Sequence, residues 1–354
     1  MTDVAERSAG TRERRAREIR PPGPGAPRAA KWRWALTTGN PPDGDLDAVT
    51  RWLILTRASV FPMTLTAGIL GGLLAWWNDG DGSWMLWALA TLGIVLAHAA
   101  NNLMNDLFDL EVGADSDDYP RALYAPHPVL SGMITRRRLL LSAAVVNVLD
   151  LAILIGLFVA RGWPVVAFAL SGLFLSVAYT APPFRLKKHG LGEPTVLVVW
   201  GPLMVGGVYY AAANSVGWDI VLASVPYALL CTAVLMGKHI DKAPWDAPAG
   251  TRTLPVIMGD RAARMTTQGM MIAFYPLVAL LVVLGAVPIL SLVCLIGVQR
   301  LVQSLRAFSH PKPDEPPPGF PVWPLWFAPI AFLHARRAGG LFILGMFAGV
   351  LIGF

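Results

Sequence analysis

The sequence contains few charged residues for its length. Charged residues make up 15% of the 354, hydrophobic residues make up 55%, and the mean hydropathy is +0.52. A soluble domain of this size needs far more polar surface to stay in water. The composition therefore excludes a water-soluble globular protein and indicates a polytopic membrane protein.

Cysteine is nearly absent as well. Cys231 and Cys294 are the two cysteines of the chain, and each lies inside an apolar segment. This usage excludes a disulfide framework or a cysteine-ligated metal centre and predicts two small core residues. The net charge of +6 does not indicate nucleic acid as a partner, because the basic residues flank the predicted spans, as membrane orientation alone requires.

Residues 1–50 lack an apolar run that could serve as a signal peptide. The first 45 residues instead hold eight arginines and the sequence Pro-Pro-Gly-Pro-Gly. We predict that residues 1–50 form a disordered, basic arm on the cytoplasmic side of a membrane.

Long apolar segments account for most of the remaining chain. Apart from a short last one, the candidate spans have lengths near the ~20 residues that a bilayer requires. They cover residues 56–77, 84–104, 139–160, 163–181, 194–213, 216–236, 265–285, 287–305 and 339–354. The predicted fold is an all-α polytopic membrane bundle of about nine transmembrane helices. Its core spans 51–305, followed by a Pro-rich cytoplasmic loop and interfacial segment at 306–338 and a final transmembrane helix at 339–354.

The distribution of lysine and arginine predicts the orientation. If the N-terminus is cytoplasmic, every one of the 29 basic residues except Arg161 falls on the cytoplasmic side. This bias is the positive-inside pattern. We therefore expect an integral protein of the cell (inner) membrane, with the polar clusters described next in the cytoplasm.

Amides and carboxylates fill the end of the second predicted span, at residues 97–115. On a helix that turns about 100° per residue, Asn102, Asp106 and Asp109 lie within roughly 60° of one another, and Asn105 lies beside them. Carboxylates on one face repel each other unless a cation is bound, and hard oxygen ligands favour Mg²⁺. The alternative is a polar helix end in contact with water.

A second polar cluster occupies the loop predicted after the sixth span, at residues 238–254. It contains Asp241 and Asp246 and emerges on the same side as the first cluster. Carboxylates that hold Mg²⁺, together with fixed cations, form the kind of site that binds a diphosphate. The alternative is a pair of unrelated hydrophilic loops. The basic residues near the two clusters are Arg121, residues 136–138, Lys238, Lys242 and Arg252.

A third cytoplasmic loop lies between the fourth and fifth predicted spans. It contains Tyr179, and Arg185 and Lys187 follow a rigid Pro182-Pro183 pair. Both cations are candidate phosphate ligands, whereas the positive-inside pattern alone accounts for Lys188.

The sequence Asn-Asp-Leu-Phe-Asp-Leu-Glu-Val-Gly-Ala-Asp at 105–115 resembles the first aspartate-rich motif of the UbiA superfamily of intramembrane prenyltransferases. The segment from Asp241 to Asp246, with the following Gly-Thr-Arg-Thr-Leu, is similar to the second, and the resemblance covers roughly residues 50–305. It implies a nine-span bundle, Mg²⁺, and transfer of an isoprenyl group from its diphosphate to an acceptor, commonly an aromatic ring.

The candidate site combines the motif positions with the nearby loops. Candidate catalytic and metal-binding residues are Asp106, Asp109, Asp241 and Asp246. Candidate substrate-binding residues are Asn102, Asn105, Arg121, Tyr179, Arg185, Lys187, Lys238 and Arg252. The chain departs from the family pattern twice, because Gly113 replaces an acid that follows as Asp115, and because the second pair is spaced five residues apart instead of four. Either Asp115 or Asp241 therefore stays open to a supporting role.

Two resemblances point to different acceptors. The run from Gly190 to Glu193 and the Tyr209-Tyr210 pair resemble 1,4-dihydroxy-2-naphthoate prenyltransferases, whereas residues 179–188 are similar to chlorophyll and bacteriochlorophyll synthases. We favour a quinone-precursor acceptor and keep esterification of a tetrapyrrole as the alternative. A membrane transporter is the alternative from another class, because Asp150 lies in the middle of a span.

Three further polar residues have two interpretations each. Asp150 is either functional or a structural carboxylate paired with an amide such as Asn147. His98 is either a hydrogen-bonded core histidine or a base, and Glu193 is either an acid at a helix N-terminus or an acceptor contact.

Overall fold

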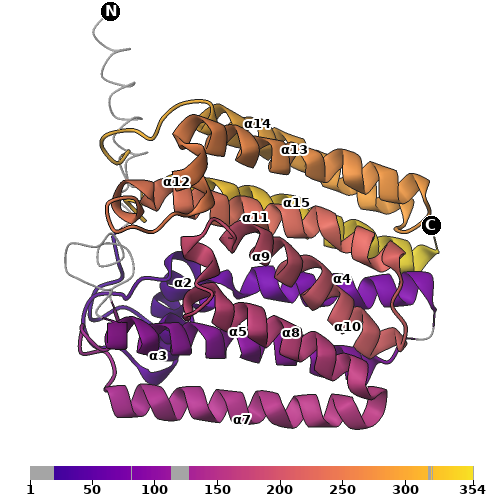
Figure 1. Cartoon of the computed structure of the whole chain (residues 1–354), viewed down its shortest axis with the longest axis horizontal. Helices are drawn as coiled ribbons and strands as arrows, with labels where there is room; N and C mark the ends of the chain where they lie inside the picture. The colour runs from indigo at the N-terminus through magenta and orange to yellow at the C-terminus, as the bar shows by residue number, and fades with distance from the viewer. Residues whose placement is uncertain (1–19, 81, 113–126, 318–319, 321, 354) are drawn as a thin grey trace, which may run out of the picture.

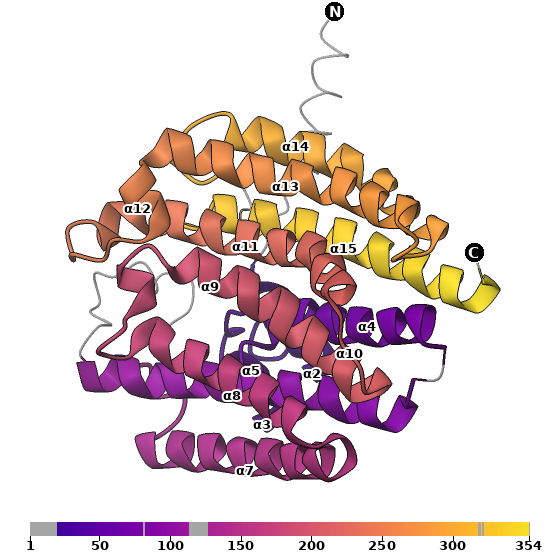
Figure 2. The ribbon, with the colours of Figure 1, turned by 45° about the vertical axis from the view of Figure 1, so that its right-hand side comes forward.

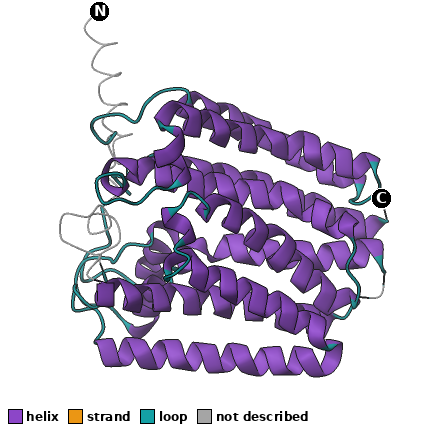
Figure 3. Cartoon of the chain, in the orientation of Figure 1, coloured by secondary structure: helices purple, strands orange, loops and turns teal. Residues whose placement is uncertain are grey.

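The computed structural model describes residues 20–112 except 81, and residues 127–353 except 318, 319 and 321; of residues 109–112 it describes the backbone alone. The described helices pack side by side with their axes roughly parallel or antiparallel (Figure 1). Figure 3 shows that loops join these helices at the two ends of the bundle. Within the described ranges the backbone contains no strand, and His189 and Arg252 form an isolated bridge.

Nine helical segments of the described chain are long and apolar enough to cross a membrane, which confirms the predicted all-α bundle. In chain order they are η1 Ala58–Val60 with α4 Phe61–Asn78, α5 Trp84–Val112, α7 Arg136–Arg161, α8 Trp163–Thr180, α9 Gly192–Val198 with η3 Val199–Leu203 and α10 Met204–Ala213, α11 Trp218–Asp246, α13 Asp260–Val283, η4 Ile289–Gly297 with α14 Val298–Phe308, and α15 Phe327–Ile352. The shorter helices are α2 Arg28–Thr38, α3 Ala48–Leu55, η2 Leu186–Lys188 and α12 Leu254–Met258.

The two ends of the bundle are defined by the helices that begin and end there. At one end, here called the site end, α5, α8 and α11 finish and α4, α9 and α15 begin, beside α2, α3 and α12 (Figure 1). At the other, here called the far end, α4 finishes and α5 begins, and the C-terminus lies there (Figure 1). The polar motifs of the sequence therefore gather at the site end.

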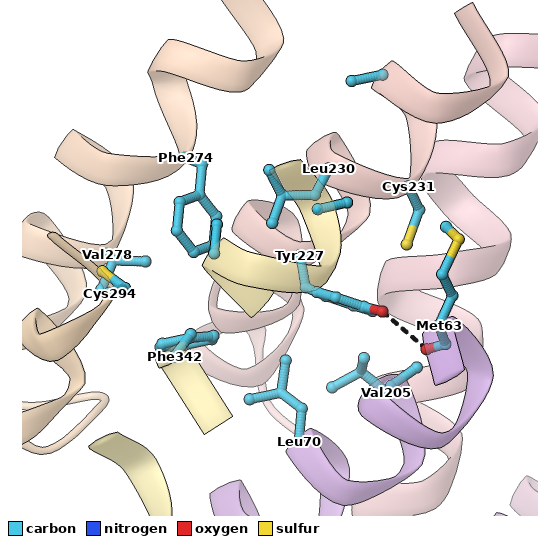
Figure 4. Close-up of a cluster of buried hydrophobic side chains, with 14 of the residues drawn as sticks. Met63, Leu70, Val205, Tyr227, Leu230, Cys231, Phe274, Val278, Cys294 and Phe342 are labelled. Atoms are coloured by element: carbon cyan, nitrogen blue, oxygen red, sulfur yellow. Dashed lines mark hydrogen bonds between the residues drawn. The ribbon is translucent and has the colours of Figure 1, made fainter. Parts of the chain in front are cut away.

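The hydrophobic core lies between α4, α11, α13 and α15. Figure 4 shows Phe274 and Phe342 packed beside Tyr227, whose hydroxyl donates a 2.8 Å hydrogen bond to the carbonyl of Met63. Cys231 and Cys294 are buried and unpaired in this region, as their apolar neighbours predict. By contrast, α7 lies at one edge of the bundle in Figures 1 and 2 and exposes residues such as Val159, so a lipid-facing surface is expected there.

Part of the predicted disordered arm is folded. The chain is helical in α2 and α3, where Ala35 is fully buried. The carboxylate of Asp47 accepts bonds from the backbone N–H groups of Val49 and Thr50, and its Oδ1 accepts one from Trp32 Nε1. The prediction of disorder over the whole of 1–50 is wrong for these helices, because an N-cap and an indole contact pack them. Residues 1–19 lie outside the described residues.

Two predicted boundaries also need correction. The last helix begins at Phe327 instead of 339, so most of the predicted interfacial segment belongs to α15. The sixth helix continues through Asp246, so Asp241 and Asp246 lie on α11 and not in a loop. Apolar content marks the part of a helix that is in lipid, whereas a helix continues into the polar region wherever its backbone groups remain paired.

Hydrogen bonds between neighbouring elements stabilise the far end. Arg161, the basic residue predicted on the opposite side from the others, donates to the carbonyls of Ala211 and Ala212 at 2.8 and 2.9 Å. Tyr210 donates to the carbonyl of Arg161, and Tyr209 donates to the carboxylate of Asp79. The Tyr209-Tyr210 pair thus lies at the end opposite the acidic clusters, where it connects helices.

Candidate functional site

The first acidic cluster contains an ion pair between a buried carboxylate and a half-buried guanidinium group. Asp106, on the last turns of α5, is 1% exposed, and its Oδ1 lies 2.5 Å from a guanidinium nitrogen of Arg57. One turn earlier, Asn102 donates a 2.9 Å hydrogen bond to the carbonyl of Thr56. The segment between α3 and α4 therefore lies directly against the amide and carboxylate face that the sequence predicts on α5.

Arg57 is a site residue that the motifs did not identify. Its φ of 54° lies in the left-handed region, which costs a non-glycine residue on the order of 1 kcal/mol. The ion pair with Asp106 compensates for this conformation. The sequence signal that was available is the position of Arg57, one residue before the first span and at the same end as the acidic motif.

His127 stabilises the end of α5 from the other side. It is 5% exposed, and its Nε2 lies 2.8 Å from the backbone carbonyl of Asp106. Its Nδ1 accepts from the N–H groups of Val129 and Leu130, so Nε2 carries the hydrogen and donates. His127 therefore fixes the backbone that carries Asp106.

The remaining predicted residues of the first cluster lie partly outside the described chain. Asn105 is half-buried on α5, while the side chain of Asp109 lies outside the described residues, as do Asp115 and Arg121 in full. Their predicted roles remain predictions.

The second pair of carboxylates is divided between two faces of α11. Five helical residues correspond to about 500°, so Asp241 and Asp246 point about 140° apart. Both oxygens of Asp241 accept bonds from the first turn of α15, from the N–H groups of Phe327 and Ala328 at 3.0 and 2.9 Å. A carboxylate at a helix N-terminus pairs with unsatisfied N–H groups and with the positive end of the helix dipole. This arrangement favours the supporting role that the motif spacing left open for Asp241.

The Pro-rich loop before α15 is held against the same part of α11. Lys312 donates to the carbonyl of Pro324, and its ammonium group lies 4.5 Å from the ring centroid of Trp323 and 5.7 Å from that of Trp245. Burial lowers the pKa of Lys312, and the negative charge of Asp241 opposes that shift. Cation–π contacts and the Asp241 charge thus keep this loop folded over the start of α15.

Asp246 shares its helix face with a buried histidine. Seven residues separate it from His239, a difference of about 20° around the helix. His239 Nδ1 lies 2.6 Å from Oε1 of Glu193, and both side chains are almost fully buried. Tyr179, at the end of α8, places its hydroxyl 3.4 Å from His239 Nε2. The sequence motifs do not identify His239 as a site residue. The available signal is its seven-residue spacing from Asp246, which places both residues on one face if the helix continues through them.

The end of α8 connects the two clusters. Ser176 donates a 2.6 Å hydrogen bond to Asn101 on α5, and Tyr179, one turn later, faces His239 on α11. His98 lies deeper, where its Nδ1 is 2.6 Å from the Thr64 hydroxyl and its ring contacts Trp200 edge-on. These contacts match the core interpretation of His98.

The loops at the site end bring further cations near the second cluster. The bridge between His189 and Arg252 joins the loop after α8 to the loop after α11. Arg185 and Arg252 are exposed, Lys187 and Lys238 are half-buried, and Lys242 is buried. The φ of 43° at Arg185 is again in the left-handed region, so both this residue and Arg57 are held in an uncommon backbone conformation at the same end of the bundle.

The donor set fits Mg²⁺ bound together with a substrate. Among the described residues no group of three or more His, Cys, Asp or Glu side chains could hold a metal by itself. Mg²⁺ commonly takes one or two protein carboxylates and completes its shell with water and substrate phosphates. The buried Asp106 beside Asn102, with Asp246 at the same end of the bundle, provides the one or two carboxylates that such a bound Mg²⁺ needs.

Asp150 lies away from both clusters, on α7. It is half-buried, and a Cβ built on Gly93 of α5 would lie 3.5 Å from its Oδ1, so the carboxylate packs against α5. Asn147 donates to the carbonyl of Ala143 in its own helix. This placement agrees with a structural role for Asp150.

Comparison with known proteins adds the family. The model of the UbiA prenyltransferase family matches residues 64–335, which is most of the chain. The chain belongs to the UbiA prenyltransferase family. It is therefore a membrane-embedded enzyme that transfers prenyl groups, and the transporter alternative loses its support.

Relatives within the UbiA family share much of the chain. A 2-carboxy-1,4-naphthoquinone phytyltransferase from a Synechocystis species is 27% identical over 73% of this chain and 81% of its own length. A 1,4-dihydroxy-2-naphthoate octaprenyltransferase from Haemophilus influenzae is 28% identical over 60% of this chain and 71% of its own length. The structure of a UbiA homologue from Archaeoglobus fulgidus bound to GPP and Mg²⁺ superposes with a TM-score of 0.56, at 18% identity, over 85% of this chain and 99% of that one. The last similarity establishes the fold.

Proposed function

We propose that this UbiA-family enzyme transfers an isoprenyl group from a long allylic diphosphate to an aromatic quinone precursor, with Mg²⁺ as cofactor. The observation that carries this proposal is the ion pair between the half-buried Arg57 and the buried Asp106, at the same end of the bundle as Asp246. A buried carboxylate paired with an arginine provides one negative group for a metal and one positive group for a phosphate. Unrelated hydrophilic loops would not require the carboxylate to be buried.

Asp106, Asp109 and Asp246 are the residues proposed to hold Mg²⁺, which supplies positive charge for the departing diphosphate. Arg57, Arg185 and Lys187 are proposed to contact the remaining phosphate oxygens. When a diphosphate binds, Arg57 can exchange its bond to Asp106 for one to phosphate. The allylic C–O bond then breaks with both electrons on the diphosphate, and a ring carbon of the acceptor supplies the electron pair for the new C–C bond. The C–H bond at that carbon then breaks, its electrons restore the aromatic ring, and the proton leaves to the released diphosphate or to water. The apolar interior of the bundle excludes water from the cation.

The buried Glu193–His239 pair is proposed to serve the acceptor. Because Glu193 holds the hydrogen on His239 Nδ1, Nε2 is the nitrogen that can accept a proton, and it faces the Tyr179 hydroxyl. A phenolic acceptor that loses its proton toward Tyr179 and His239 becomes a stronger carbon nucleophile. The second oxygen of Glu193 is buried without a hydrogen-bond partner among the described residues, so it can take up a donor from the acceptor.

Two naphthoate-type relatives support the acceptor class. Tyr209-Tyr210 no longer supports it, because the pair connects helices at the far end. A tetrapyrrole, as in chlorophyll synthases, is the second candidate, and the sequence of the loop after Tyr179 favours it. For the cell, we propose the inner membrane with the site end in the cytoplasm, because the basic residues concentrate at that end.

An acceptor screen tests the proposal. Purified protein with Mg²⁺ and radiolabelled geranylgeranyl diphosphate should prenylate 1,4-dihydroxy-2-naphthoate and should not esterify a tetrapyrrole propionate. The reverse preference would move the enzyme to the chlorophyll-synthase branch. Absence of diphosphate release with either acceptor would contradict the assigned chemistry.

A matched pair of variants tests the acceptor role of Glu193. Glu193→Gln retains the side-chain shape but loses the charge that orients His239, so turnover should fall by about two orders of magnitude, as expected when a general base is lost. The apparent KM for the prenyl diphosphate should not change, and the pH dependence of turnover should shift. Ser176→Ala, in the same region, is the control. An unaltered pH profile in Glu193→Gln would show that the pair is structural.

A further inference from the structure

α14 exposes a polar face in a place where a membrane span usually exposes apolar residues. Its buried side consists of residues such as Leu301 and Phe308, while Gln299 and Gln303 are exposed and Arg300 is half-buried. In both Figure 1 and Figure 2, α14 lies at the edge of the bundle opposite α7. The polar face is therefore on the outside of the bundle and away from the substrate site.

This face continues into a crevice between α14 and α15. The crevice has a volume of about 310 Å³ and is lined by Ile296, Gln299, Arg300, Gln303, Leu333 and Arg337. Arg300 donates a 2.7 Å hydrogen bond to the side chain of Gln303. Within the described part of the chain, neither Arg300 nor Arg337 forms an ion pair with a carboxylate. Two positive charges thus converge on one outward-facing crevice.

These arginines lie on the halves of their helices that face the site end. At 1.5 Å per residue, Arg300 lies about 12 Å from the site end of its helix and Arg337 about 15 Å. The predicted topology assigns this half of the bundle the cytoplasmic basic residues, and the apolar span predicted within α15 begins only after Arg337, at 339. Long arginine side chains at this level can extend to the interface and pair with an anion there. An anion that is itself part of the bilayer can reach them from the headgroup layer of the site-end leaflet.

The chemistry of the crevice selects its occupant. Guanidinium groups bind phosphate through paired N–H donors, and Ile296 and Leu333 offer apolar surface for an acyl chain. A soluble anion has no such apolar contact and does not partition into the bilayer. A second copy of the chain related by two-fold symmetry would place the same arginine pair against itself.

We propose that the crevice between α14 and α15 binds an anionic phospholipid, with its phosphate between Arg300 and Arg337 and an acyl chain along Ile296 and Leu333. This site is separate from the prenyl-transfer site and extends beyond the proposed function. It anchors α14 and α15 to the leaflet at the site end.

Lipid retention tests the proposal without an activity assay. The full-length protein is purified in micelles that contain equal amounts of phosphatidylcholine and phosphatidylglycerol, and the bound lipids are quantified by mass spectrometry. Wild type should retain more phosphatidylglycerol than phosphatidylcholine. The double variant Arg300→Gln/Arg337→Gln should lower that excess by at least about fivefold, because the loss of even one basic residue near an anionic lipid has an effect of this size. Arg300→Lys/Arg337→Lys should retain part of the excess. Arg306→Gln/Arg336→Gln removes one arginine from each of the same helices outside the crevice and should behave as wild type.

Several results would overturn the site. Equal retention of both lipids by wild type, or an equal loss in the Arg306/Arg336 control, would refute it. Displacement of the lipid by millimolar inorganic diphosphate would indicate a site for soluble anions, and a change of oligomeric state without a change in lipid would indicate a protein interface. If the double Gln variant does not fold, the single Arg337→Gln variant, whose side chain is exposed, decides the comparison by the same lipid ratio.

Discussion

The contacts of Asp241 lead to a prediction that separates structural from catalytic carboxylates. Asp241→Ala removes the acceptor for two buried N–H groups at the start of α15. A hydrogen bond to a charged group contributes about 1.5–3 kcal/mol, so the variant should lose about 3 kcal/mol or more of stability. Asp241→Asn retains one acceptor oxygen and should lose about half as much. Turnover of the variant that remains folded should stay within about tenfold of wild type, because Asp241 points away from Asp246.

The assay compares thermal unfolding with single-turnover transfer for the same preparations. Tryptophan fluorescence reports unfolding of the whole bundle, since the chain contains 13 tryptophans, including Trp326 directly before the helix that Asp241 caps. Asp246→Asn is the matched control on the same helix and should show the opposite pattern, with a large loss of rate and little change in Tm. If Asp241→Asn instead retained the wild-type Tm, lost about two orders of magnitude in rate and needed more Mg²⁺, Asp241 would be a metal ligand and the capping argument would be wrong.

Four further outcomes are expected. Asp106→Asn and Asp246→Asn should each lower turnover by about two orders of magnitude or more, because each removes charge that stabilises the transition state; near-normal, metal-dependent transfer by both would contradict the site. A chelator should abolish transfer and added Mg²⁺ should restore it, measured as diphosphate release, and transfer that persists after chelation would exclude the cofactor. Arg57→Gln should raise the apparent KM for the prenyl diphosphate more than Arg51→Gln, a control in α3, and equal effects would remove Arg57 from the site. The hydroxyl and N–H of Thr50 lower the pKa of Asp47 in the folded state. The stability that Asp47 contributes as an N-cap is therefore present above its unfolded pKa of about 4 and is lost as the pH falls below that value. Thermal unfolding measured from about pH 6 to 3 should show this loss in wild type and a smaller one in Asp47→Asn.

The transmembrane helices were predictable because the bilayer imposes a length and a composition on each of them. The shared face of Asn102 and Asp106 on α5 was equally predictable, since residues on one continuous helix have fixed angular relations. The same rule would have shown that Asp241 and Asp246 diverge and that His239 joins Asp246. The rule holds only for a continuous helix, however, and the polar composition after residue 236 predicts a loop there.

Contacts between distant segments were beyond the reach of the sequence. No local pattern shows that Arg57 reaches Asp106, that Glu193 orients His239, or that Asp241 caps a helix that starts 86 residues later. These pairs form because packing of the apolar faces brings the helix ends together, and burial then requires each polar group to find a partner. Composition and periodicity thus determined the class and the spans and predicted the chemistry proposed for the site, while packing of the helices determined which carboxylates cap or connect helices and therefore support the fold.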